Sequence, residues 1–251
     1  MSNLVDFHFH LDYYSDNKDK YNYLNEHKIY TLCVTNLPEI YERCINTYQN
    51  TKYVKFALGF NPQFAGSENL NKKLFNKYME TTKYIGEVGL DYSKEHISSK
   101  SKQIEVFDYI CSLDKDKNKI FSVHSRGAEK DVMEILVKNK IKTAVFHWYS
   151  GKSEFVDEIS KRGYFFSVNY AMTKSKSGRE IIKRIPLKNL LVESDGPFVQ
   201  INNKQITPEH LIMTYNSLEE ILSLNVIQIV NDNLRRLLID NANLRTIKDL
   251  R

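Results

Sequence analysis

The feature that most constrains the fold is a regular alternation of short apolar segments with charged, helix-like segments. Eight apolar segments have the composition of buried strands: residues 3–9, 29–36, 53–60, 84–90, 119–125, 142–149, 164–170 and 189–194. Between the fifth and the sixth, Val132, Ile135 and Leu136 have helical spacing and the other faces carry charges. Residues 101–118 repeat this pattern. Strands that alternate with helices favour right-handed βαβ units and a parallel sheet.

Eight is the number of strands that closes a (β/α)8 barrel, and 251 residues is a typical length for one. We therefore predict an α/β protein with a single TIM-type barrel domain over residues 1–251. An open, doubly wound sheet is the alternative, but its first strand usually ends in a glycine-rich phosphate turn, and here it runs into "HFHLDYY". Residues 217–238 predict two short helices that close the barrel, and residues 240–251 predict a surface tail.

The composition sets the broad class. Hydrophobic residues make up 41% of the chain, which is enough for a full core, and the net charge of +5 mildly favours an anionic partner such as nucleic acid. A lysine-rich solvated surface gives the same sum. Three cysteines without CxxC spacing suit a reducing compartment. Without a signal-peptide pattern or an apolar run of membrane length, we expect a cytoplasmic protein with no membrane partner.

The strongest functional signal is a pair of histidines at the end of the first apolar segment. His8 and His10 are two residues apart, so in a strand both side chains point to the same side. Functional residues of barrels gather at the C-terminal ends of the strands, where both imidazoles would face the mouth. Two neutral imidazoles placed in this way can chelate a metal ion.

Residues of the same kind end four other strand segments. They are Glu87, His124, His147 and Asp195. Histidines and carboxylates together suit Mg²⁺, Mn²⁺ or Zn²⁺, and a carboxylate can bridge two ions. The alternative is four separately satisfied core histidines with two capping carboxylates.

Five sequence blocks also carry a family resemblance. In order they are "DFHFHLD", "IGEVGLDY", "VHSRGAEKD", "VFHWYSG" and "LLVESDGPF", from residue 6 to residue 198, and "NLRRLL" near the C-terminus resembles a closing helix. They resemble the signature blocks of the TatD-like metal-dependent deoxyribonucleases of the amidohydrolase superfamily. The resemblance covers nearly the whole chain. It implies a TIM-type barrel, two divalent metal ions (Mg²⁺, Mn²⁺ or Zn²⁺) and hydrolysis of phosphodiester bonds in DNA.

By motif position, the resemblance implies two metal sites. His8, His10, Glu87 and Asp195 would hold one ion, and Glu87, His124 and His147 would hold the second. Asp195 and Glu87 are the expected catalytic residues. Glu87 would fix the separation of the ions, and Asp195 would accept a proton from the metal-activated water.

The substrate contacts are expected around this centre. Arg126 follows His124 by two residues and can bind a phosphate, or instead start a helix and pair with a surface acid. Trp148 is one of several aromatic residues after strand ends on which bases of single-stranded DNA can stack, or which can simply pack loops. Asn61 stands where the family usually has a histidine, so its substrate contacts are expected to differ.

Three further acids lie close to these blocks. Asp6 shares the face of His8 and is expected to support the site or pack the barrel. Asp12 is expected to cap the first helix. Asp91 is expected to orient a histidine or to contact substrate.

The departures from the family pattern suggest a divergent branch, with the TatD-like nucleases of Qat-type anti-phage gene clusters as one candidate. Such a branch implies a role in antiviral defence or DNA repair, and partner proteins from the same cluster. The favoured function is an exonuclease on single-stranded DNA. The alternatives are a hydrolase of another ester or amide, such as one that deacylates D-aminoacyl-tRNA, and a nucleic-acid-binding subunit with a structural metal site.

Overall fold

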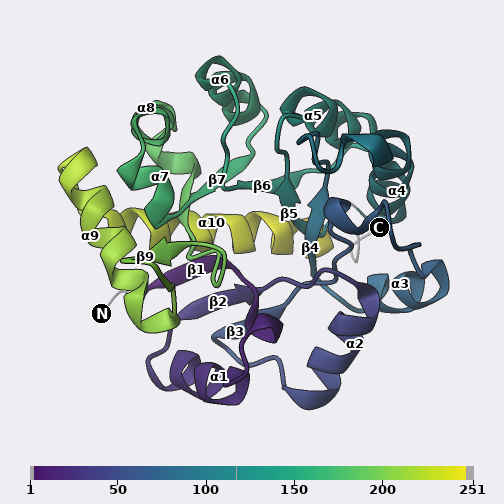
Figure 1. Cartoon of the computed structure of the whole chain (residues 1–251), viewed down its shortest axis with the longest axis horizontal. Coiled ribbons are helices and arrows are strands. Elements are labelled where there is room, and N and C mark those ends of the chain that lie inside the picture. The colour runs from purple at the N-terminus through teal and green to yellow at the C-terminus, as the bar shows by residue number, and fades with distance from the viewer. Residues whose placement is uncertain (1–2, 117, 247–251) are drawn as a thin grey trace.

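All eight predicted segments form strands, which follow one another around a parallel barrel in a computed structural model of the chain (Figure 1). The structure describes residues 3–116 and 118–246, with side chains as far as residue 239. The barrel strands are β1 (Val5–Phe9), β2 (Tyr30–Cys33), β3 (Val54–Phe56), β4 (Tyr84–Gly89), β5 (Ile120–His124), β6 (Thr143–His147), β7 (Phe165–Val168) and β8 (Leu190–Val192).

Backbone hydrogen bonds close the barrel. Within it, β1–β2–β3 and β4 to β8 pair in chain order, and a parallel bridge between Leu58 and Ile85 joins the two sets. The last strand returns to the first, because Asp195 N donates to the carbonyl oxygen of His8 at 2.9 Å and His10 N donates to that of Gly196 at 2.9 Å. First and last strands are neighbours, so the predicted TIM-type barrel is confirmed and the open sheet is excluded.

Helices cover the outside of the barrel (Figure 1). They are α1 (Asn17–Glu26), α2 (Pro38–Thr47), α3 (Lys72–Met79), α4 (Lys100–Leu113), α5 (Glu129–Lys138), α6 (Ser153–Lys161), α7 (Tyr170–Lys174), α8 (Lys176–Arg184), α9 (Leu211–Leu222) and α10 (Val226–Thr246). A short hairpin of β9 (Gln200–Ile201) and β10 (Lys204–Gln205) follows the eighth strand.

The first strand shows how the barrel separates its core from its site. All five residues of β1 are buried, because the barrel interior covers one face and helices cover the other. Phe7 and Phe9 are fully buried in the hydrophobic core. His8, on the opposite face, reaches across the barrel, where its Nδ1 lies 2.8 Å from Ser122 Oγ of β5. Alternation along one strand therefore supplies both packing and a polar interior.

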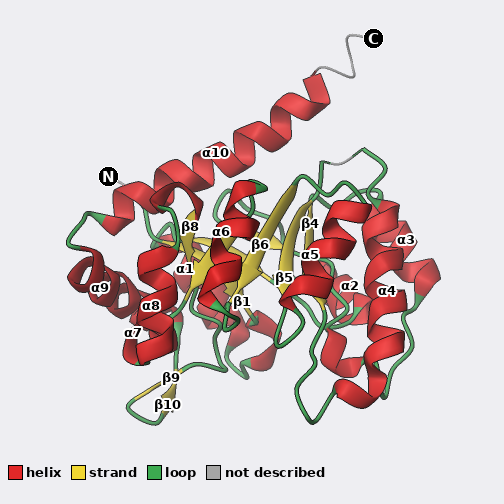
Figure 2. Cartoon of the chain, turned by 90° about the horizontal axis from the view of Figure 1, so that it is seen from above, coloured by secondary structure: helices red, strands yellow, loops and turns green. Residues whose placement is uncertain are grey.

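Helix α10 crosses the barrel at the end opposite to the β9–β10 hairpin (Figure 2). Asn233 Nδ2 donates to the carbonyl oxygens of Leu187 at 2.6 Å and Leu190 at 2.7 Å, at the start of β8. The prediction of two closing helices holds in number, but the second has 21 residues and is not short. The predicted tail is wrong for residues 240–246, which continue α10 because no glycine or proline ends it; residues 247–251 lie outside the described part.

Candidate metal centre

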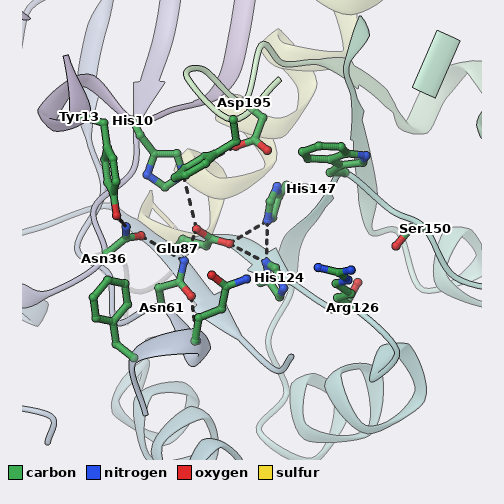
Figure 3. A pocket seen from close by; sticks show the side chains of 15 residues that line it. His10, Tyr13, Asn36, Asn61, Glu87, His124, Arg126, His147, Ser150 and Asp195 are labelled. Atoms are coloured by element: carbon green, nitrogen blue, oxygen red, sulfur yellow. Dashed lines mark hydrogen bonds and ion pairs between the residues drawn. The ribbon is translucent and has the colours of Figure 1, made fainter. Parts of the chain in front are cut away.

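The six predicted ligand residues come together at the open end of the barrel, and all of them except His8 are labelled in Figure 3. They arrive from the ends of five strands, and the side chains are buried or, for His124, nearly so. Two sets of three have ligand atoms within 4.8 Å of one another: His8, Glu87 and His147, and His8, His10 and Asp195.

The first ligand group consists of His8, His10 and Asp195. The Nε2 atoms of the two histidines are 3.2 Å apart, and each lies 3.7 Å from Asp195 Oδ1. Glu87 Oε2 lies 3.8 Å from His8 Nε2 and 3.5 Å from His10 Nε2. Four potential ligand atoms therefore surround one point.

The second ligand group consists of His124 and His147. Their Nδ1 and Nε2 atoms are 3.2 Å apart, and they lie 2.7 and 2.9 Å from Glu87 Oε1. The two oxygens of Glu87 are thus divided, one toward each group, as Figure 3 shows for its labelled residues. This division is the geometry that a carboxylate needs to bridge two ions.

The donor set fits a divalent metal ion. Four nitrogen or oxygen ligands around Zn²⁺ at 2.0–2.1 Å lie about 3.3 Å apart, which resembles the spacing found here. Within the described residues, Asp195 Oδ1 is buried without a hydrogen-bond partner, an arrangement that costs free energy in the metal-free protein. His8, His10 and Asp195 would hold one ion and His124 and His147 a second, with Glu87 between them.

Burial shifts the pKa values of all three residues of the first ligand group. Burial lowers the pKa of His8 and His10 to about 3, so their rings are neutral and their lone pairs free at neutral pH. Burial raises the pKa of Asp195 well above its usual value, and the nearby carboxylates of Glu193 and Glu87 add to the shift.

The second group has the opposite charge pattern. Burial would raise the pKa of Glu87, but the neighbouring imidazoles of His147 and His124 hold it well below its usual value. Burial would lower the pKa of His124, but hydrogen bonds to Asp91 and Glu87 raise it to about 9. Without metal, His124 therefore carries a proton that a cation would displace.

These shifts predict that metal binding releases protons. In the metal-free protein the His124 imidazole is protonated at pH 7.5, because its pKa is about 9, and the pKa of the Asp195 carboxyl is raised by burial. Both groups must be unprotonated to become ligands. We expect the apparent metal affinity to rise with pH between about 6 and 9. Calorimetric titration with Mn²⁺ in two buffers of different ionisation enthalpy measures the proton count. A count near zero would contradict this charge assignment.

Asp91 holds His124 in place. Its Oδ2 lies 2.8 Å from His124 Nε2 and accepts a hydrogen bond from Gln63 Nε2 at 2.9 Å, so the other ring nitrogen, Nδ1, faces Glu87. The structure thus favours the expectation that Asp91 orients a histidine. Carboxylates in this position fix the tautomer and raise the basicity of the ligand.

Replacing Asp91 by asparagine is expected to weaken metal binding or hydrolysis about 10- to 100-fold without unfolding the protein. The amide keeps the shape but removes the charge that favours His124 Nδ1 as a ligand. Metal affinity and hydrolysis rate, measured together with thermal unfolding, check this. Wild-type values for both would show that His124 needs no carboxylate partner.

Two other acids differ in their contacts. Asp6 accepts hydrogen bonds from Ser194 N at 2.8 Å and Ser194 Oγ at 2.5 Å, so it ties β1 to the exit of β8. Asp12 does not cap the first helix, because it lies inside a 3₁₀ turn, and the residue at the N-terminus of α1 is Asp16. The prediction for Asp12 was wrong because the strand exit contains an extra turn before the helix begins.

Sequence reasoning missed Glu193, which is fully buried behind the site. Glu193 accepts hydrogen bonds from Trp148 N at 2.9 Å, Asn169 Nδ2 at 3.1 Å and Ser167 Oγ, and it lies 3.9 Å from His147 Nδ1. Its only signal was a charged residue inside the apolar segment "LLVES". It links three strand ends around His147.

Asn61 contacts the centre rather than open space. Its Nδ2 donates to Glu87 Oε2 at 2.7 Å and to Asn36 Oδ1 at 3.2 Å, and its Oδ1 accepts from Gln63 N at 2.9 Å. These bonds occupy both amide hydrogens. Asn61 therefore positions Glu87, and its predicted substrate contact stays a prediction.

Arg126 and Trp148 line a cavity of about 590 Å³ above the ligand groups, together with Ser150. Arg126 is exposed and points into the same cavity as Glu87 and His147 (Figure 3). Trp148 is half-buried and packs against the hydrophobic core. Arg126 is thus available to bind an anion, whereas part of the Trp148 side chain packs against the hydrophobic core.

Two residues of the site have left-handed backbone conformations. The φ of Asp195 is 48° and that of Trp148 is 36°, which non-glycine residues rarely adopt. Such conformations cost about 1–3 kcal/mol each and are concentrated at functional sites. At Asp195 the turn coincides with the residue whose carboxylate faces His8 and His10.

A barrel with imidazoles and carboxylates gathered at its mouth has the kind of site that a metal-dependent hydrolase needs. The profile of one family, described as TatD related DNase, matches residues 5–239. The chain therefore belongs to the TatD-related DNase family, and the predicted resemblance is confirmed.

Individual relatives agree with this assignment. The chain is 30% identical over 174 residues, 69% of its length, to a protein of Encephalitozoon cuniculi named "Putative deoxyribonuclease TATDN1 homolog", of which it spans 62%, less than two thirds. It is 25% identical to the uncharacterized metal-dependent hydrolase MJ1582 of Methanocaldococcus jannaschii, over 88% of this chain and 90% of that one.

The fold is also shared with a solved structure. The crystal structure of YJJV, a TatD homolog from Escherichia coli K12, superposes with a TM-score of 0.84 at 20% identity, over 94% of this chain and 98% of that one.

Within the described residues, no helix is both long enough and apolar enough to cross a membrane.

Proposed function

We propose that this chain is a metal-dependent deoxyribonuclease that hydrolyses phosphodiester bonds of single-stranded DNA, acting from a strand end. The observation that carries the proposal is the division of the two Glu87 oxygens between two ligand groups. A pair of ions held by these two groups would lower the pKa of a bound water and would stabilise the negative charge of an in-line displacement at phosphorus.

Residues of the chain itself position the two ligand groups and accept the proton of the water. Glu87 fixes the spacing between the two groups, and Asn61 holds one of its oxygens at 2.7 Å. Asp195 faces the first ligand group, and its carboxylate can accept a proton from the attacking water. The raised pKa of Asp195, caused chiefly by burial, suits a general base more than that of an ordinary carboxylate does.

The position of Arg126 in the cavity favours a phosphodiester as the substrate. Its guanidinium group can bind the oxygens of a neighbouring phosphate with two hydrogen bonds. The cavity of about 590 Å³ has room for a small part of a nucleic acid chain, which favours a strand end over the middle of a duplex.

A substrate panel tests this proposal against the other ester hydrolases. Chelator-stripped protein, reloaded with Mn²⁺, is offered labelled single-stranded DNA, duplex DNA, RNA and D-aminoacyl-tRNA. We expect release of mononucleotides from single-stranded DNA at the highest rate. Release of amino acid from the charged tRNA, without nucleotide release from DNA, would overturn the proposal.

A further inference from the structure

An exposed pair of aromatic rings stands beside the first ligand group. Tyr13 follows β1 and Phe198 follows Asp195, yet their ring centroids are only 5.2 Å apart. Each also contacts the ring of His10 edge to face, at centroid distances of 5.6 Å for Tyr13 and 5.0 Å for Phe198. We call Tyr13 and Phe198 the aromatic pair.

The aromatic pair exposes apolar ring surface to solvent, which is unfavourable. Tyr13 is 45% exposed and Phe198 49% exposed, and both line the cavity above the ligand groups. Among the described residues, neither ring belongs to one of the two hydrophobic core clusters, whereas Trp148 packs against both clusters. The pair therefore contributes little to the described packing, and its open surface faces the cavity.

The cavity has two unlike sides. Tyr13 lies on one side of Glu87, and Arg126 and Ser150 lie on the other (Figure 3). An aromatic surface and a cation, separated by a candidate metal centre, match the parts of a nucleotide chain: a base, a phosphate under attack and the next phosphate. The contact of the pair with His10 places the base beside the reacting phosphate.

We infer that Tyr13 and Phe198 form the subsite that stacks the unpaired base next to the scissile phosphate. This inference rests on the proposed nuclease function and deepens it, because a base can stack there only when it is not paired. The aromatic pair is then a determinant of the preference for single strands. The hydroxyl of Tyr13 accepts a hydrogen bond from Asn36 Nδ2 at 2.7 Å, which fixes its ring and lowers the entropy lost on stacking.

The test combines a protein variant with a substrate variant. Phe198→Ala is assayed on single-stranded oligonucleotides that are normal or that lack the base at one position near the cleaved bond. On normal DNA we expect KM to rise about 5- to 150-fold, the range for one stacked base, with little change in kcat. On the substrate without the stacked base, wild type loses the same factor, and Phe198→Ala loses nothing more.

Four controls make the result specific. Phe198→Trp is expected to restore the KM for normal DNA, and Phe198→Ala is expected to bind metal as wild type does. The rate on duplex DNA should not fall, so the preference for single strands shrinks. Leu187→Ala removes a side chain that is 40% exposed at the opposite end of the barrel and is expected to keep wild-type KM.

The possible failures are distinguishable. If wild type cleaves DNA but Phe198→Ala loses equal activity with and without the base, or loses none, the stacking subsite is wrong and the nuclease stands. If wild type cleaves no DNA with any metal, the proposed function fails and the subsite falls with it.

Discussion

Replacing Glu87 by glutamine is expected to reduce metal-dependent hydrolysis by at least about 1,000-fold, a loss of roughly 4 kcal/mol of transition-state stabilisation. Glutamine keeps the size of the side chain but removes its negative charge, and it cannot offer an anionic oxygen to each ligand group. Because Asn61 donates to Glu87 Oε2, the variant can still be held in place through its amide oxygen. Steady-state hydrolysis of single-stranded DNA measures the effect.

Metal stoichiometry shows whether this loss has the stated cause. Wild type is expected to bind two ions with measurable affinity, and Glu87→Gln to lose at least one. Glu134→Gln, which changes an exposed carboxylate of α5, serves as the matched control and should keep wild-type activity and stoichiometry. Full activity in Glu87→Gln would remove the bridging carboxylate from the account.

Asp195→Asn is expected to reduce hydrolysis to a similar extent, about 1,000-fold or more. The same substitution is expected to leave the metal-free protein at least as stable as wild type. The carboxylate is buried near Glu193 and Glu87, its Oδ1 has no hydrogen-bond partner among the described residues, and the φ of Asp195 is 48°. Asparagine removes the like-charge repulsion and fits a left-handed conformation well. Chelator-treated Asp195→Asn should therefore unfold at the same temperature as wild type or higher.

Thermal unfolding with and without Mn²⁺ separates the two effects. We expect Mn²⁺ to raise the unfolding temperature of wild type strongly and that of Asp195→Asn weakly, because binding to the native state is linked to stability. Such a trade between activity and stability is common at active sites. An active Asp195→Asn protein, or one that unfolds well below metal-free wild type, would show that Asp195 has a structural role.

The barrel and the members of the ligand groups could be foreseen because their signals are local. Strand segments alternate with helical ones, and a residue that ends a parallel strand is placed at the barrel mouth by the fold itself. His8 and His10 needed only the period of a strand to be put on one side. What the sequence could not supply is the division of the Glu87 oxygens, which depends on side chains from three strands.

The features that the sequence did not show are mainly contacts between distant segments. Asn61 lies in a loop, and only the fold shows that its amide group reaches Glu87. Glu193 sits in a buried strand segment, and its partners come from β6 and β7 and the residues that follow them. The aromatic pair joins residues 185 positions apart in the chain, so neither Tyr13 nor Phe198 pointed to the other. The tail prediction failed for a local reason, because residues 240–246 continue the helix that begins at Val226.

The central claim is that this chain hydrolyses DNA through metal ions held around Glu87. The most direct test is nucleotide release from 5′- and 3′-labelled single-stranded DNA by chelator-stripped protein, with Mg²⁺, Mn²⁺ or Zn²⁺ restored, beside Glu87→Gln and Asp195→Asn. The account predicts release that needs the metal, that is lost in both variants and that starts from one labelled end. No release with any metal, from folded protein that binds metal, would contradict it.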